Sequence, residues 1–270
     1  MNALGIIVVN FFEKYLINEK GDSNNTIESY SKCLQMLLTF CCNKLKLKID
    51  KLSLTDLNQE IILCFLDYLE QKRCNCARTR NQRLAAIKCF SRYAARCHPV
   101  FLLNCSQICE ICDKETEHKV IKSLTKSEVQ AIIEMPNTNK KNGARDFCLL
   151  TMLYNTGARV QELCDLKIAD ISTGKLKQVL LTGKGQRQRT IPLWDEAYTS
   201  IENYLAFRPD AAADEYLFLN ACGQPINRGG INYIVKKHSK KAAEKCLTLA
   251  GKTITPHKFR HTAALHLIQS

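Results

Sequence analysis

Four basic residues in the second half of this 270-residue sequence are of types that bind phosphate and move protons. Arg159 lies two residues after Gly157, at a point where a new helix is expected to begin, and the free N–H groups there favour an anion. His257 and Arg260 are three residues apart on an expected helix, so they share one face. Because the guanidinium fork pairs with phosphate oxygens, Arg159, His257 and Arg260 could converge on one tetrahedral anion. Lys184 is flanked by glycines, and from the tip of a two-stranded ribbon its ammonium group could reach a nucleic-acid groove and donate a proton.

The elements that must position these residues can be placed from local signals. Residues 143–154 are typical of a buried helix, which Gly157 ends. Residues 178–181 and 187–192 are typical of strands and flank a Gly183-Lys184-Gly185 turn, which predicts a hairpin. The other elements expected in this half are helices at 195–207 and 227–241, a short strand at 216–219, and a helix from Pro256 to the end of the chain.

The first 112 residues carry apolar side chains at helical spacing and predict a domain of helices with short connections. Thr55 is expected to cap the third helix, and the fourth is expected to cover 77–96 and stop at Pro99. Residues 113–122 are polar and charged, as is typical of a linker. A capping-box pattern in Thr125-Lys126-Ser127-Glu128 then predicts that a second domain, 123–270, opens with a helix.

The fourth expected helix is strongly basic. Residues 71–96 contain eight lysines and arginines and no acidic residue. Solvated charged faces usually mix both signs, so this bias favours contact with phosphates or a groove. The side chains that we expect to contact DNA are Arg78, Arg80, Arg83, Lys88, Arg92 and Arg96.

The formal charge of +13 indicates an anionic partner, with double-stranded DNA ahead of a membrane surface. The longest apolar run, at residues 4–12, is far below the roughly 20 residues that span a bilayer. It also lacks a basic leader and a cleavage site, which disfavours a signal peptide. We therefore expect a cytoplasmic protein that does not bind a membrane.

The 15 cysteines form no regular framework, so we expect reduced thiols in the cytosol, mostly buried as small apolar groups. One cluster is formed by Cys105, Cys109 and Cys112, with His98 and His118 nearby. Its spacing lacks the second cysteine pair of most zinc sites, so no metal is expected.

Three motifs occur in order in the second half. They are Thr-Gly-Ala-Arg-Val-Gln-Glu-Leu at 156–163, Leu-Thr-Gly-Lys-Gly at 181–185 with Arg-Thr-Ile-Pro-Leu at 189–193, and Thr-Pro-His-Lys-Phe-Arg-His-Thr at 255–262. They resemble the first arginine box, the hairpin lysine and the His-x-x-Arg box of the tyrosine recombinases, which include phage integrases, Xer proteins and transposon recombinases. The resemblance covers nearly the whole chain, and the three boxes together are a specific signal.

The resemblance implies a mainly α fold with a small β-sheet: an N-terminal helical core-binding (SAM-like) domain and an α+β integrase-type catalytic domain. It implies that Arg159 and Arg260 clamp the scissile phosphate and that Lys184 protonates the departing 5′ oxygen. His257 would hydrogen-bond the phosphate, and Glu162 would position its neighbours. Neither a metal nor another cofactor is needed in this family.

The family's nucleophile is a tyrosine downstream of the His-x-x-Arg box, where it forms a 3′ phosphotyrosine. All nine tyrosines here precede that box, so the resemblance identifies no nucleophile among residues 1–270. A truncated reading frame, a fragment of a longer protein and a tyrosine supplied by another subunit each account for this. We favour the first two and expect a chain that binds DNA without cutting it.

We therefore expect a site-specific DNA recombinase or integrase of a mobile element, acting on duplex DNA with other recombinase subunits, which form tetramers in relatives. One alternative is a non-catalytic DNA-binding remnant or regulator of a full-length recombinase. Others are a type IB topoisomerase, which shares the clamp residues, and an RNA-binding or scaffold protein. Relaxation of supercoils without sequence preference would support the topoisomerase.

Overall fold

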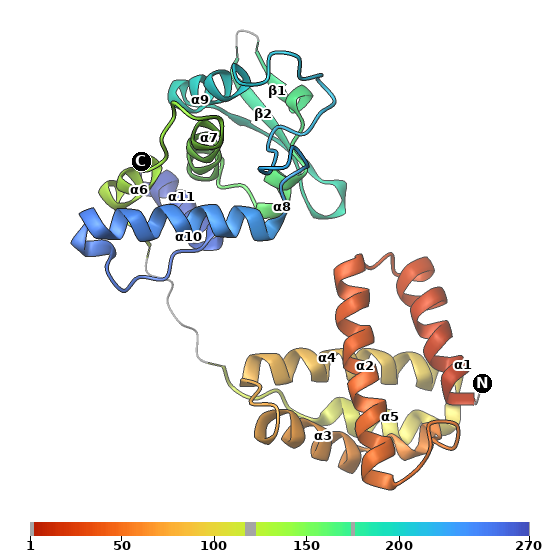
Figure 1. The fold of residues 1–270 in the computed structure, drawn as a ribbon. Helices are drawn as coiled ribbons and strands as arrows, with labels where there is room; N and C mark the ends of the chain where they lie inside the picture. The colour runs from red at the N-terminus through yellow and green to blue at the C-terminus, as the bar shows by residue number, and fades with distance from the viewer. Residues whose placement is uncertain (1–2, 117–122, 174–175, 270) are drawn as a thin grey trace. The chain divides into compact units, whose positions relative to one another are not determined.

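The computed structural model describes residues 3–116, 123–173 and 176–269, with residue 184 described by its backbone alone. The chain divides into two compact units, Met1–His118 and Lys119–Ser270, each with its own apolar core. The division falls inside the segment 113–122. Figure 1 labels the α-helices of each unit and the strands β1 and β2.

The first unit consists of helices around α4, which packs against α2, α3, α5 and a π-helical segment (Figure 1). Its core includes Phe11, Phe65, Phe90 and Phe101, each at most 1% exposed. The helices are α1 (Ala3–Asn10), continued by the π-helical segment Phe11–Glu19, then α2 (Asn24–Leu45), α3 (Gln59–Gln71), α4 (Ala77–Cys97) and α5 (Leu102–Glu110), with 3-10 turns at Leu54–Asp56 and Pro99–Phe101.

The expected cap of the third helix was wrong. Helix α3 begins four residues after Thr55, and its N-cap is Asn58, whose side chain accepts a hydrogen bond from Ile61 N at 3.0 Å. Thr55 lies instead in a 3-10 turn, where Ser53 and Asp56 form the capping box. Two adjacent segments thus carry capping residues, and only packing decides which one continues as a helix.

The second unit places its helices around α7, which packs against α6, α9 and α11. Residues 148–153 of α7 are all buried, so this helix is the centre of the core. The helices are α6 (Lys126–Ile133), α7 (Lys141–Thr156), α8 (Val160–Cys164), α9 (Asp195–Leu205), α10 (Arg228–Lys245) and α11 (Pro256–Gln269), with 3-10 turns at Ile168–Asp170, Lys184–Gln186 and Leu247–Leu249.

The expected hairpin is present as part of a three-stranded antiparallel sheet in the order β1-β2-β3. Strands β2 (Gln178–Thr182) and β3 (Gln188–Pro192) flank the turn, and β1 (Ile171–Ser172) adds an edge that the sequence did not indicate. The expected strand at 216–219 was wrong, because this segment forms only single bridges, Lys167 with Tyr216 and Leu219 with Pro225. The mainly α architecture with a small sheet is confirmed.

The entrance to the second unit follows the predicted capping box. Glu128 N donates to Thr125 Oγ1 at 3.2 Å, and Thr125 N donates to Glu128 Oε2 at 3.1 Å. Helix α6 begins at the next residue, Lys126. The backbone of Leu124 donates to the buried hydroxyl of Thr262 on α11 at 3.1 Å, so the start of the unit is fixed to its last helix.

A buried ionic network connects α7 and α10. The Asp146 carboxylate is 1% exposed and accepts hydrogen bonds from Arg145 Nη2 at 2.6 Å and Nε at 3.0 Å. His238 Nε2 lies 2.9 Å from its other oxygen, and Lys237 Nζ lies 3.5 Å from that same oxygen. Burial raises the pKa of Asp146, but the hydrogen bonds from His238 and Arg145 outweigh it and lower the pKa. The ionised carboxylate therefore joins the two helices.

The cysteines are less buried than expected. Five of the 15 are buried and five are exposed, and the exposed ones are Cys74, Cys76, Cys97, Cys112 and Cys222. All 15 are free thiols. Across the described ranges, no helix is both long and apolar enough to cross a membrane.

Candidate phosphate-binding site

Arg159 is positioned by a sharp break between two helices. Gly157 ends α7 in the left-handed conformation with φ 55°, which glycine adopts without a steric penalty. Thr156 supports the break, since its hydroxyl donates to Met152 O at 2.6 Å and accepts from Ala158 N at 3.2 Å. Arg159 then becomes the N-cap of α8, and its side chain is 56% exposed.

The Glu162 carboxylate lies at the centre of the site and contacts three arginines. Its side chain is 2% exposed, and its oxygens accept hydrogen bonds from Arg159 N at 2.7 Å and Arg159 Nη1 at 3.0 Å. Arg189 donates to both oxygens, Nη1 to Oε1 at 2.9 Å and Nη2 to Oε2 at 2.6 Å. Arg260 Nη1 lies 3.9 Å from Oε2. Three guanidinium groups from three separate elements therefore surround one buried carboxylate.

Arg260 comes from α11, 101 positions beyond Arg159 in the sequence. Its Nη1 donates to the carbonyl oxygen of Gly157 at 2.6 Å, so the helix break that exposes Arg159 also anchors Arg260. The structure therefore brings Arg159, Glu162 and Arg260 together. His257, one turn earlier on α11, is exposed, and its side chain forms no hydrogen bond within the described ranges.

The hairpin approaches the same cluster through Gly183. A Cβ atom built at Gly183 would lie 3.0 Å from Glu162 Oε1 and 3.6 Å from Arg159 Nη1, so a larger residue would push the hairpin away. The backbone of Lys184 opens the 3-10 turn directly after Gly183. The Lys184 side chain lies outside what the structure describes, and its predicted role stays a prediction.

Arg189 was not among the expected site residues. It pairs with Leu181 in the sheet register, and Leu181 is fully buried, so Arg189 lies on the inward face of the hairpin. The alternation in Arg189-Thr190-Ile191 carries the signal that could have identified it, because a charged residue on an inward face requires a partner.

The arginines determine the electrostatics of the cluster. Burial raises the pKa of Glu162, but hydrogen bonds from Arg189 and Arg159 outweigh it and hold the pKa at about 2. Burial and the charge of Arg159 lower the pKa of Arg260, whereas the bond to Glu162 raises that of Arg189. Because arginines remain charged in proteins, the cluster is net positive. An open cleft of about 570 Å³ beside it is lined by Arg159, Gly183, Gly185, Arg187, Gln188 and Arg189.

The expected DNA-contacting side chains of α4 fall into two groups. Four of them bind within the first unit. Arg80 is 5% exposed and donates to Cys112 O, Arg83 donates to Ser29 O, Lys88 donates to Ile111 O, and Arg96 donates to both oxygens of Glu19 at 2.7 Å. Arg78 and Arg92 are exposed, and their guanidinium groups form no ion pair with an acidic residue within the described ranges.

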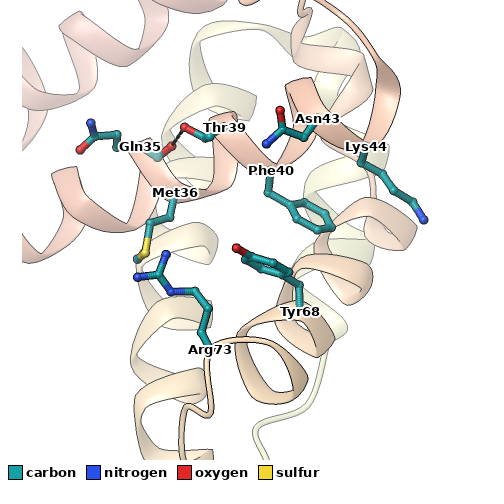
Figure 2. A pocket seen from close by; sticks show the side chains of 8 residues that line it. All are labelled: Gln35, Met36, Thr39, Phe40, Asn43, Lys44, Tyr68 and Arg73. Carbon is teal, nitrogen blue, oxygen red and sulfur yellow. Dashed lines mark hydrogen bonds between the residues drawn. The ribbon is translucent and has the colours of Figure 1, made fainter.

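A second hollow, of about 500 Å³, lies in the first unit (Figure 2). Figure 2 shows the rings of Phe40 and Tyr68 facing each other, and their centroids are 5.2 Å apart. Lys44 and Arg73 are among the residues that line it, and these include no acid. Its charge suits an anionic partner, but none of the predicted site residues lies in it.

The described residues also bear on the expectations about metal ligands and tyrosines. Among those residues, no three His, Cys, Asp or Glu side chains are placed to hold a metal ion, and His118 of the expected cysteine cluster lies outside them. The residues that line the cleft include no tyrosine. Tyr154 instead bonds His266 Nδ1 at 2.7 Å, beside Trp194.

Comparison with known proteins gives a consistent result. Residues 122–270 match the model of the phage integrase family, and residues 9–98 match that of the phage integrase N-terminal SAM-like domain. The chain is 35% identical to the putative integrase/recombinase y4rD of Sinorhizobium fredii, over 96% of this chain and 92% of that protein. It is 30% identical to the tyrosine recombinase XerC of Leptospira interrogans, over 96% of this chain and 79% of that protein.

The fold is also found in solved structures. The structure of the XerH recombinase bound to its palindromic difH substrate has a TM-score of 0.70 at 20% identity, covering 96% of this chain and 73% of that one. That of a lambda integrase dimer bound to a core site has a TM-score of 0.68 at 15% identity, covering 97% of this chain and 88% of that one.

Proposed function

Since this chain belongs to the phage integrase family of tyrosine recombinases, we propose that it acts on duplex DNA as part of a mobile element's site-specific integration or excision system. In this proposal residues 1–270 bind the duplex and hold its scissile phosphate. The observation that carries it is the convergence of Arg159, Arg189 and Arg260 on Glu162 beside an open cleft. Paired guanidinium groups in a partly buried setting suit a phosphodiester.

In this proposal some of the site residues bind the phosphate and others transfer protons. Arg159 and Arg260 hold the two non-bridging oxygens and stabilise the charge that develops on them. Lys184 protonates the 5′ oxygen as it leaves, and the approach of Gly183 to Glu162 brings its turn to the clamp. His257 donates a hydrogen bond to the phosphate from the exposed start of α11. Glu162 orients the arginines and takes no part in proton transfer, because its low pKa keeps it ionised.

In this proposal residues 1–270 do not supply the nucleophile. A tyrosine must attack the phosphate to form the phosphotyrosine of this chemistry. All nine tyrosines of the sequence precede the His-x-x-Arg box, and none is among the described residues that line the cleft, so we propose that this segment binds without cutting. The same observation favours the alternative of a non-catalytic DNA-binding regulator of a full recombinase. The SAM-like match of the first unit favours either of these over a type IB topoisomerase.

The first unit contributes phosphate contacts through the exposed guanidinium groups of α4. Arg78 and Arg92 are exposed on α4, and neither guanidinium forms an ion pair with an acidic residue among the described residues. Solved relatives are bound to DNA, and one lambda integrase structure is a tetramer on a Holliday junction. We extend both features to this chain, with double-stranded DNA as its ligand and other recombinase subunits as its partners. We also propose the cytoplasm as its compartment.

The test compares DNA binding and DNA cleavage. Binding of a labelled duplex by residues 1–270 should weaken steeply with salt, with a slope of about −0.9 per phosphate neutralised. The double substitution Arg159→Met and Arg260→Met should weaken binding and lower the slope, whereas Lys240→Met on the exposed part of α10 should do neither. A flat salt response would contradict the proposal. A covalent adduct trapped on a suicide substrate would overturn the claim about the nucleophile.

A further inference from the structure

We propose that Arg189 is a positioning residue: it occupies the Glu162 carboxylate so that the remaining guanidinium N–H groups of Arg159 and Arg260 stay available to bind phosphate. This inference rests on the proposed function and assigns a role to a residue that the motif resemblance leaves without one. Arg189 comes from the lysine hairpin, so its role also concerns how that hairpin meets the two clamp arginines.

The geometry of the pair is that of a bidentate fork. Arg189 Nη1 and Nη2 each donate to a different oxygen of Glu162, at 2.9 and 2.6 Å. The carboxylate is 2% exposed, whereas the Arg189 side chain is 36% exposed. Bidentate charge-assisted pairs are the strongest ion pairs in proteins and fix orientation as well as distance.

Glu162 has a limited capacity, and the clamp arginines compete for it. An ionised carboxylate offers about four acceptor positions. Two take hydrogen bonds from Arg159, at its backbone N and its Nη1, and two take the fork of Arg189. Arg260 Nη1, at 3.9 Å, stays outside hydrogen-bond range and bonds Gly157 O instead. The carboxylate is therefore saturated without a bond from Arg260.

Removal of Arg189 would open two acceptor positions on a buried anion. Leaving a buried carboxylate half paired is costly, so the nearest donors should turn to fill these positions. Those donors are the remaining guanidinium N–H groups of Arg159 and Arg260. Each N–H group that turns to Glu162 can no longer bind a phosphate oxygen. By pairing with Glu162, Arg189 therefore keeps these N–H groups of Arg159 and Arg260 available.

The same pair fixes the hairpin to α8. Strand β3 carries Arg189 and is joined to β2 by the turn of residues 184–186. Gly183, at the base of this turn, already approaches Glu162 and Arg159 closely. The ion pair of Arg189 with Glu162 is the side-chain bond between β3 and α8 in the described ranges. Loss of this pair should therefore also displace the turn that carries Lys184.

A double-mutant cycle separates this role from a direct contact with DNA. The variants are Arg189→Met, Glu162→Gln and both together, and the readout is the dissociation constant for a labelled duplex at fixed salt. We expect Arg189→Met to weaken binding by about tenfold, the size of one charge-assisted contact. In the double variant the neutral amide no longer attracts the clamp arginines, so most of that loss should be recovered.

The matched control is Arg187→Met. Arg187 lies on the same hairpin, lines the same cleft and forms no side-chain bond with Glu162. The loss of binding free energy in Arg187→Met should add to the loss in Glu162→Gln, and the double variant should show no recovery. The conservative Arg189→Lys keeps the charge but not the two-pronged hydrogen bond, so its dissociation constant should lie between that of Arg189→Met and that of the unchanged chain. Thermal melts of every variant distinguish lost folding from lost binding.

The outcomes distinguish the two claims. If Arg189→Met and Glu162→Gln are additive, like Arg187→Met and Glu162→Gln, Arg189 contacts phosphate directly and the positioning role is overturned while the proposed function stands. No loss of binding in Arg189→Met would overturn it as well. If the unchanged chain and the variant lacking Arg159 and Arg260 bind duplex DNA equally, the proposed function itself fails.

Discussion

The side chain of Asn81 and the backbone of Lys114 exchange two hydrogen bonds: Asn81 Nδ2 donates to Lys114 O at 2.7 Å, and Lys114 N donates to Asn81 Oδ1 at 3.0 Å. On either side, Arg80 Nη1 donates to Cys112 O at 2.9 Å and Lys88 Nζ donates to Ile111 O at 2.6 Å. Residues 111–114 contain no helix or strand, yet α4 holds them by these contacts. The chain therefore leaves the first unit from a fixed point.

Asn81→Ala should release this segment. The substitution removes both hydrogen bonds to Lys114, and because each contributes about 1 kcal/mol, exchange of the Lys114 amide should become faster by about tenfold or more. Hydrogen exchange followed by mass spectrometry measures it. Gln82→Ala, on the exposed neighbouring face of α4, is the control and should leave the rate unchanged. An equal rate in both variants would show that Asn81 does not hold the segment.

The two groups of basic residues on α4 should differ in DNA binding. Arg78→Met together with Arg92→Met removes two exposed cations and should lower the salt slope by about 1 for each phosphate that is no longer neutralised. Lys88→Met should leave the slope nearly unchanged, because its ammonium group already bonds Ile111 O. Titrations of a labelled duplex at several salt concentrations measure the slopes. A larger effect from Lys88→Met than from the double substitution would reverse this assignment.

Asp146→Asn should strongly destabilise the second unit. It leaves the buried Arg145 guanidinium and His238 without their anion, and breaking a buried ion pair costs about 3–5 kcal/mol. Trp194 is the single tryptophan of the sequence and lies in this unit, so urea unfolding followed by its fluorescence reports on this unit. Lys237→Met is the control: its side chain is 38% exposed and 3.5 Å from Asp146, so its loss should cost about 1 kcal/mol or less.

Glu162 should make the second unit sensitive to acid. Its pKa in the folded chain is about 2, below the ordinary 4.5, so the unfolded chain binds this proton more readily. The stabilisation is complete above pH 4.5 and is lost as the pH falls from 4.5 towards 2. The difference in urea midpoint between the unchanged chain and Glu162→Gln should therefore shrink over that interval. A difference that stays constant from pH 6 to pH 3 would contradict the low pKa.

Local signals in the sequence predicted the elements well where a single residue decides the backbone. Gly157 was expected to end a helix and does so with a positive φ, and Thr125 with Glu128 forms the expected cap of α6. The failures came where two local signals compete. Thr55 and Asn58 are both capping residues, and residues 216–219 have strand-like composition but no neighbouring strand to extend.

The sequence by itself determined the family, because arginine, lysine and histidine occur in it at the spacing of three family motifs, and it predicted phosphate binding as the chemistry of these residues. Only the tertiary structure decided which cationic side chains are already bonded within the protein and which remain available for a ligand. Arg96 bonds Glu19, which is 77 positions away, Arg80 bonds Cys112, and Arg189 bonds Glu162. The physical reason is that a charged group takes the nearest donor or acceptor in space, and that neighbour depends on how distant segments pack.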